Sequence, residues 1–182
     1  MSSTIKVDEI QTAAGGTTVL DTKREFDAWR LSANFTSGDS IITGWERADG
    51  DDASVCPVPI GTGLTEESGV FSFPVTGYYR IDATILLNST IANFQFTTTA
   101  KVSNDDGSNF INYVTGMLGN TDADDYQESC TMKFFINAKN VSGSNTTKFN
   151  FTAADNTSGE TVLGDTNMNL TYFTCQRLAP AQ

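Results

Sequence analysis

The sequence predicts an all-β protein, an antiparallel jelly-roll β-sandwich preceded by a short extended N-terminal arm. From Gly77 to Leu87, apolar and polar side chains alternate at period two, which is typical of a strand with one face on a core. Clusters of Gly, Asn, Asp and Ser recur roughly every 8–15 residues, as in a sandwich of many short strands. No segment shows a convincing helical pattern. We therefore expect an arm over residues 1–23 and a jelly-roll head over residues 24–182.

The central segment, residues 69–87, sets the pattern for the head. A short strand over residues 70–73 meets Pro74, which lacks an N–H and therefore belongs at a strand end. Gly77 can take the positive φ that the turn between this strand and the next one needs. The longer strand then begins, and its predicted core face carries Tyr79, Ile81, Ala83, Ile85 and Leu87.

Six further segments show the same alternation of apolar and polar side chains. They cover residues 26–35, 94–102, 110–117, 132–138, 149–153 and a last strand running from Met168 through Tyr172 to Cys175. Residues 103–109 contain Asp-Gly and predict the tip of a hairpin. Residues 142–145, Ser-Gly-Ser-Asn, predict a second hairpin turn.

The central segment also resembles a family signature. An aromatic-x-Phe-Pro run, a glycine and then a strand opening on two aromatic residues are similar to the trimeric jelly-roll heads of the complement-globular-head and tumour-necrosis-factor families. The matching residues are Phe71, Phe73, Pro74, Gly77, Tyr78 and Tyr79. With its flanking strands, the likeness spans residues 24–179. It implies a homotrimer whose sheet faces the threefold axis with Tyr78 and Arg80, and with Tyr172 or Phe173 of the last strand.

The first 23 residues differ from the head. Their apolar side chains, set among charged and small residues, are Ile5, Val7, Ile10, Val19 and Leu20. The segment fits a small β-hairpin or an extended arm, and it is too short to bury an apolar face by itself, so it needs a partner surface. Residues 3–12, followed by Gly-Gly-Thr-Thr-Val, resemble the N-terminal modules of bacteriophage fibre and virion proteins. That resemblance implies that the arm attaches the head to capsid or tail protein.

Charge and hydropathy exclude two classes of partner. The net charge is −11 and the pI is near 4.2, which repels nucleic acid and anionic membrane, and there is no basic block to bind phosphates. No apolar run approaches the length of a membrane span. The first residues lack the apolar core of a signal peptide. We therefore expect no nucleic-acid partner, no membrane insertion and assembly in the host cytoplasm.

The residue types do not suggest catalysis. The chain has no His, the commonest general base and metal ligand. Its three cysteines, Cys56, Cys130 and Cys175, match no zinc spacing and are expected to be free thiols. Acidic loops at residues 49–52 and 122–125 leave calcium binding open, although neither has EF-hand spacing. We expect no enzymatic activity and no cofactor.

These observations together predict a structural virion protein of a bacteriophage. It would be a homotrimeric fibre or decoration head, attached through its arm to capsid or tail, with polar loops that reach host-surface glycan or protein. The alternative is a non-viral bacterial trimer with a jelly-roll fold that binds a carbohydrate or another ligand. The sequence leaves open the choice between capsid and tail and the identity of a receptor.

Overall fold

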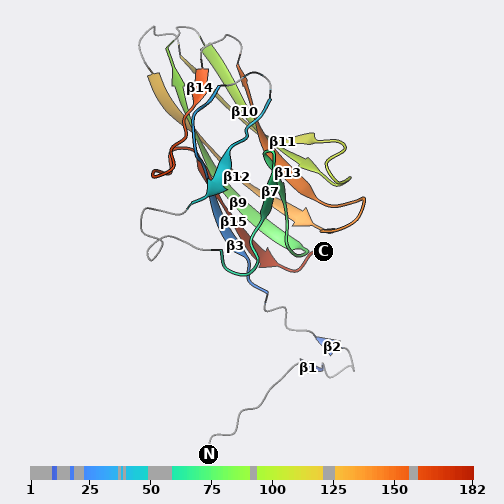
Figure 1. Cartoon of the computed structure of the whole chain (residues 1–182). Coiled ribbons are helices and arrows are strands. Elements are labelled where there is room, and N and C mark those ends of the chain that lie inside the picture. Colours follow the sequence, from blue (N-terminus) through green and yellow to red (C-terminus); the bar gives the residue numbers. More distant parts are fainter. Residues whose placement is uncertain are drawn as a thin grey trace, which may run out of the picture.

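The structure is a computed structural model that describes residues 10–11, 17–18, 23–36, 38, 40–48, 59–90, 94–120, 126–155 and 160–182. Every regular element within these residues is a β-strand, and every pairing is antiparallel. The strands of the head form two sheets that pack face to face around one apolar core (Figure 1). The predicted fold class is therefore confirmed.

The larger sheet has seven strands. Along its path the order is β4 (Phe35–Thr36), β14 (Glu160–Val162), β9 (Gly77–Ser89), β15 (Tyr172–Ala179), β3 (Phe26–Leu31) and β6 (Trp45–Arg47). The seventh strand, β12 (Tyr126–Ala138), pairs with β9 along its whole length. We call this the seven-stranded sheet, and the face turned away from the core its outer face.

The second sheet has six strands. Its order is β11 (Ile111–Asn120), β10 (Phe94–Ser103), β13 (Lys148–Asp155), β8 (Val70–Ser72) and β7 (Thr65–Glu67), and β5 (Ser40–Ile41) pairs with β13. β10 and β11 form the predicted hairpin, with its tip at residues 103–109. Outside the head, β1 (Ile10–Gln11) and β2 (Thr17–Thr18) pair only with each other, as in the small hairpin that the arm sequence allows.

Most of the chain alternates between the two sheets, and this changes one sequence-based prediction. Residues 142–145 do not form a hairpin turn, because β12 pairs with β9 in one sheet whereas β13 pairs with β10 and β8 in the other. The segment is a connection across the end of the sandwich. Gly and Ser mark a turn equally well in both situations, so only the pairing of the flanking strands could distinguish them.

The alternation predicted from the sequence places the core correctly. All five residues named on the core face of β9 are at most 1% exposed. Aromatic rings from both sheets meet at the centre, where Phe71 stacks on Phe149 at 5.1 Å and lies edge-on to Phe173 at 4.8 Å. Each such ring pair contributes roughly 0.5–1.5 kcal/mol beyond the burial of its area.

Two strand boundaries differ from the prediction. The predicted strand over residues 26–35 is two strands, because the chain leaves the ladder at Ser32, whose N–H and hydroxyl both donate to the carbonyl of Gly44. The last strand begins at Tyr172 rather than Met168, and Met168 is 55% exposed in the connection that precedes it.

Candidate functional site

Three of the four predicted interface residues lie on the outer face of the seven-stranded sheet. Tyr78 and Arg80 alternate with the core residues of β9, and the Arg80 guanidinium is paired with Asp82 at 2.8 Å. Tyr172, on β15, is opposite Thr84 of β9 and is half-buried. These side chains share one face, as predicted, and their role in a subunit interface stays a prediction.

The fourth residue, Phe173, is wrongly predicted as an interface residue. Its side chain is fully buried, edge-on to Trp45 at 5.4 Å and to Phe71 at 4.8 Å. The pleat of a strand sends neighbouring residues to opposite faces, so Tyr172 and Phe173 cannot share the outer face. Pairing of β15 with both β9 and β3 places Phe173 inside the sandwich.

A second apolar surface, not predicted from the sequence, lies along β11. Ile111, Tyr113 and Met117 of this strand are 62%, 50% and 59% exposed. They do not share one face of the strand, because the register with β10 shifts by one residue at Tyr113, which places Met117 opposite Thr97 but Ile111 opposite the buried Val102. We call these three residues the β11 row. The sequence predicts a strand over residues 110–117, but it shows neither the register shift nor the position of this strand at a sheet edge.

The β11 row lies where the two sheets meet. β11 and β12 are the edge strands of their sheets and run beside each other, and the Tyr113 hydroxyl donates to the carbonyl of Phe135 on β12 at 2.7 Å. Phe135 is itself 52% exposed. Gly116 allows this close approach, because a β-carbon at that position would overlap the sulfur of Cys130.

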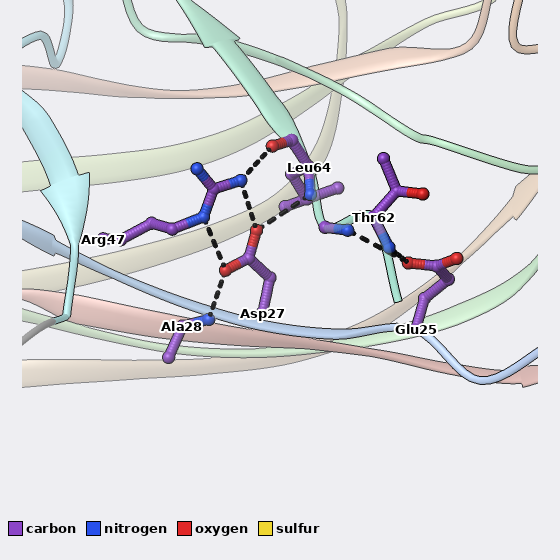
Figure 2. A network of polar contacts seen from close by, with 7 residues as sticks. Glu25, Asp27, Ala28, Arg47, Thr62 and Leu64 are labelled. Carbon is purple, nitrogen blue, oxygen red and sulfur yellow. Dashed lines mark hydrogen bonds and ion pairs between the residues drawn. The ribbon is translucent and has the colours of Figure 1, made fainter. Parts of the chain in front are cut away.

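Buried carboxylates hold together the base of the head, where the chain enters β3. Glu25 is 8% exposed, and one of its oxygens accepts the N–H groups of Thr62 at 2.8 Å and Gly63 at 3.0 Å (Figure 2). Gly61 has φ of 83°, and a side chain there would collide with Glu25 and the Arg24 carbonyl. The loop over residues 60–64 is therefore fixed to the start of the head by a carboxylate that takes two backbone donors.

A second carboxylate, Asp27, continues this network. Its side chain is 3% exposed, accepts the Leu64 N–H at 2.8 Å and lies 3.3 Å from Nη2 of Arg47 (Figure 2). The same Arg47 nitrogen donates to the Leu64 carbonyl at 2.7 Å, and the guanidinium lies 4.8 Å from the ring centroid of Trp29. We call Glu25, Asp27, Arg47 and the backbone that they bind the base network.

Arg177 of β15 extends the base to the C-terminal strand. Its Nη1 donates to the Lys23 carbonyl at 2.7 Å, and its Nε donates to the Thr76 carbonyl at 3.0 Å. Its backbone N–H donates to the Glu25 carbonyl at 2.9 Å. Residues 23–25, through which the arm joins the head, are thus tied to β15, and Arg177 also ties β15 to the turn before β9. Of the predicted anchor residues, Ile10 lies in β1, whereas Ile5, Val7, Val19 and Leu20 lie outside the described residues.

The cysteines agree with the prediction where the structure describes them. Cys130 and Cys175 are free and buried, and Cys56 lies outside the described residues. Burial raises the pKa of the Cys130 thiol, with a smaller contribution from Glu128, and burial raises that of Cys175 well above its ordinary value. Both thiols are therefore held in the protonated, unreactive form at neutral pH.

The part of the chain that the structure describes contains no group of three or more His, Cys, Asp or Glu side chains placed to hold a metal ion. The two acidic loops considered for calcium, residues 49–52 and 122–125, lie outside it. Among the described residues there is also no helix long and apolar enough to cross a membrane.

Comparison with solved structures identifies the type of sandwich. An Eiger TNF from S. frugiperda superposes with a TM-score of 0.63 at 14% identity, covering 87% of this chain and 95% of that one. Murine APRIL superposes with a TM-score of 0.57 at 11% identity, covering 86% of this chain and all of that one. The head has a tumour-necrosis-factor-like jelly-roll fold. No family model and no curated protein sequence matches the chain.

The tumour-necrosis-factor-like fold agrees with the resemblance drawn from the Phe71–Tyr79 segment. In the structure this segment forms β8, the turn at Pro74 and the start of β9, so it joins the two sheets. Phe71, Phe73 and Tyr79 from this segment are all buried in the core. Gly77 does not have the positive φ expected of it, and its lack of a side chain instead leaves room for the Arg177 side chain and the Ala179 carbonyl. At these identities the likeness establishes the fold, and function has to be argued from the surface.

Proposed function

We propose that the tumour-necrosis-factor-like head assembles as a homotrimer and acts as a non-enzymatic binding module of a bacteriophage particle. Residues 1–23 would attach it to capsid or tail protein, and its polar loops would contact the host surface. The attachment rests on the resemblance of residues 3–12 to fibre and virion modules and on the apolar side chains that so short an arm cannot bury alone.

The observation that supports the trimer is that one subunit carries two different apolar surfaces. One is on the edge strand β11, where Ile111 and Met117 are 62% and 59% exposed. The other is the outer face of the seven-stranded sheet, with Tyr78, Tyr172 and Phe135, which lies opposite Arg80 and is 52% exposed. Contact between two unlike patches produces a ring when the rotation closes. Clustered exposed aromatic and Met side chains are typical of subunit interfaces.

The oligomer is tested by light scattering on the purified chain. We expect a mass of three times 19.6 kDa. Met117→Lys should dissociate the trimer, because it places an unpaired charge in the interface. Met168→Lys is the matched control, since Met117 and Met168 are 59% and 55% exposed but Met168 lies in the connection before β15, away from the β11 row. Tyr78→Asp should act like Met117→Lys.

Attachment of the chain to a phage particle is tested in a separate experiment. We expect the chain to co-purify with assembled phage particles and to be located on their surface by electron microscopy. A stable monomer at micromolar concentration would refute the trimer. A trimer that is absent from particles but binds a ligand would favour the non-viral alternative.

A further inference from the structure

A cleft of about 440 Å³ lies at one end of the sandwich, beside the β11 row. Its floor is apolar, formed by Val102 of β10 and Ile136 of β12, which are 6% and 3% exposed. Its rim carries polar side chains on Asn104, Lys139 and Asn140 together with the ring of Tyr113. An apolar floor with a few converging polar groups is the usual composition of a small-molecule site.

The Tyr113 ring is fixed in place. Its hydroxyl donates to the Phe135 carbonyl at 2.7 Å, and its ring lies 6.0 Å from that of Phe134 in an edge-on arrangement. Half of the side chain nevertheless remains exposed. A ring held in this way loses little conformational entropy when a ligand stacks on it.

The amide side of the cleft is also held by hydrogen bonds. The Thr147 hydroxyl donates to the Asn104 side-chain oxygen at 3.1 Å, and the Thr147 N–H donates to the Asn140 carbonyl at 2.8 Å. The Asp106 N–H donates to the Thr146 carbonyl at 3.1 Å, so the β10–β11 hairpin tip is tied to the β12–β13 connection. The two segments lie on the same side of the head (Figure 1). The backbone of the rim and the Asn104 side chain are therefore held in place before any ligand arrives.

The charge of the cleft is opposite to that of the protein. The whole chain has 22 acidic and 11 basic residues. The residues that line the cleft include one cation, Lys139, and no acidic side chain. A lone ammonium beside neutral amides and an aromatic ring favours a ligand that carries one negative charge.

We propose that this cleft binds an acidic sugar, a pyranose that carries a carboxylate. The C–H face of the pyranose would stack on the exposed half of Tyr113, and its hydroxyls would exchange hydrogen bonds with the amides of Asn104 and Asn140. Its carboxylate would accept hydrogen bonds from the Lys139 ammonium. The inference specifies the surface contact in the proposed function and rests on the head being a binding module. Tyr113 lies between Ile111 and Met117 on β11, so the cleft opens beside the proposed subunit contact, which would leave the exposed half of Tyr113 uncovered.

The test is saturation-transfer NMR on the full chain with methyl glucuronide and methyl glucoside, which differ in the carboxylate. We expect both to bind at millimolar concentration and the glucuronide to bind about two- to fivefold more tightly, the range for one exposed ion pair. Lys139→Gln should remove that difference. Lys133→Gln should not, because Lys133 is an exposed lysine of β12 that does not line the cleft.

Substitution of the ring tests the stacking. Tyr113→Ala should lower the affinity for both sugars by about two- to tenfold, whereas Tyr113→Phe keeps the ring and should largely retain the affinity. Asn104→Ala does not alter β11 and should also weaken the binding of both sugars. This second variant tests the cleft even if Tyr113→Ala loosens the strand.

Three results would overturn the proposal: no saturation transfer to either sugar, equal affinities for the two sugars, or binding that these substitutions leave unchanged. Light scattering on the same samples separates this proposal from the proposed function. A monomer that binds the glucuronide refutes the trimer alone, and a particle-bound trimer that does not bind it refutes the cleft alone.

Discussion

Replacing Arg47 with Met is expected to destabilise the head much more than the exposure of Arg47 suggests. The arginine side chain is 41% exposed, but its partner Asp27 is 3% exposed. Without the guanidinium, the Asp27 carboxylate would stay buried with only the backbone donors of Ala28 and Leu64. Removing one member of a buried pair costs about 3–5 kcal/mol, mainly because the other charge is left uncompensated.

Two features decide where in that range the loss falls. The two Arg47–Asp27 contacts are both long, 3.3 Å, and the two backbone donors remain, which favours the lower end. The variant also loses the bond to the Leu64 carbonyl and the contact with the Trp29 ring, each worth roughly 1 kcal/mol. We expect a loss of about 4 kcal/mol, a large share of the roughly 5–15 kcal/mol that stabilises a typical domain.

The assay is equilibrium urea unfolding followed by tryptophan fluorescence, at one protein concentration and with the oligomeric state checked, because association adds to apparent stability. Lys148→Met is the matched control. Its ion pair with Asp106 is shorter, 2.9 Å, but Asp106 is 49% exposed, so we expect a loss of only about 0–1 kcal/mol. Equal losses in the two variants would refute the argument from burial of the acid. The argument would also be refuted if the losses of stability from Arg47→Met and Asp27→Ala simply added in the double variant, because the effects of two paired residues should be coupled.

Three further predictions follow from the edge, the hairpin tip and the arm. Gly116→Ala should lower the free energy of unfolding in urea by about 1–3 kcal/mol, because the added methyl group overpacks against Cys130. Adding Cys130→Ala should restore part of this stability. An unchanged free energy of unfolding in Gly116→Ala would contradict the close packing of β11 on β12. Hydrogen bonds from the Ser103 hydroxyl and from Asn109 lower the pKa of Asp105 to about 2. The wild type should therefore have a higher Tm than Asp105→Ala above about pH 4, and this difference should disappear as the pH falls towards 2. A Tm difference that stays constant with pH would refute this prediction. Deleting residues 1–20 should leave a folded trimer, judged by its thermal melt, that no longer incorporates into particles, and normal occupancy would refute the anchor.

The base network illustrates what sequence reasoning missed. Glu25 and Asp27 flank Phe26, the first apolar residue of the head, and in the sequence they resemble any solvated acidic residues. The structure brings residues 60–64 and Arg47 against them, and burial turns the two carboxylates into acceptors for backbone N–H groups. Nothing local in the sequence signals this, because the backbone partners lie 37 or 38 residues away in the chain and Arg47 lies 20 residues from Asp27.

The sequence by itself determined the class of fold and the identity of most core residues. Strand geometry forces successive side chains to opposite faces, so the alternation along β9 and along residues 132–138 of β12 separated buried from exposed positions without any knowledge of partners. The same geometry says that Tyr172 and Phe173 face opposite ways. It cannot say which of the two points inward, because both are aromatic and either could fill a core.

Only the tertiary structure decided that question, and it decided the location of the exposed surfaces for the same reason. Phe173 is internal because β15 lies between β9 and β3, where the inner face meets Trp45 and Phe71. The β11 row is exposed because β11 is an edge strand with no neighbour on one side, and the core contact of this strand is already made by Val114 and Leu118. Burial depends on what lies opposite a strand, and long-range pairing sets it, whereas the alternation of side chains is set by the covalent geometry of the chain.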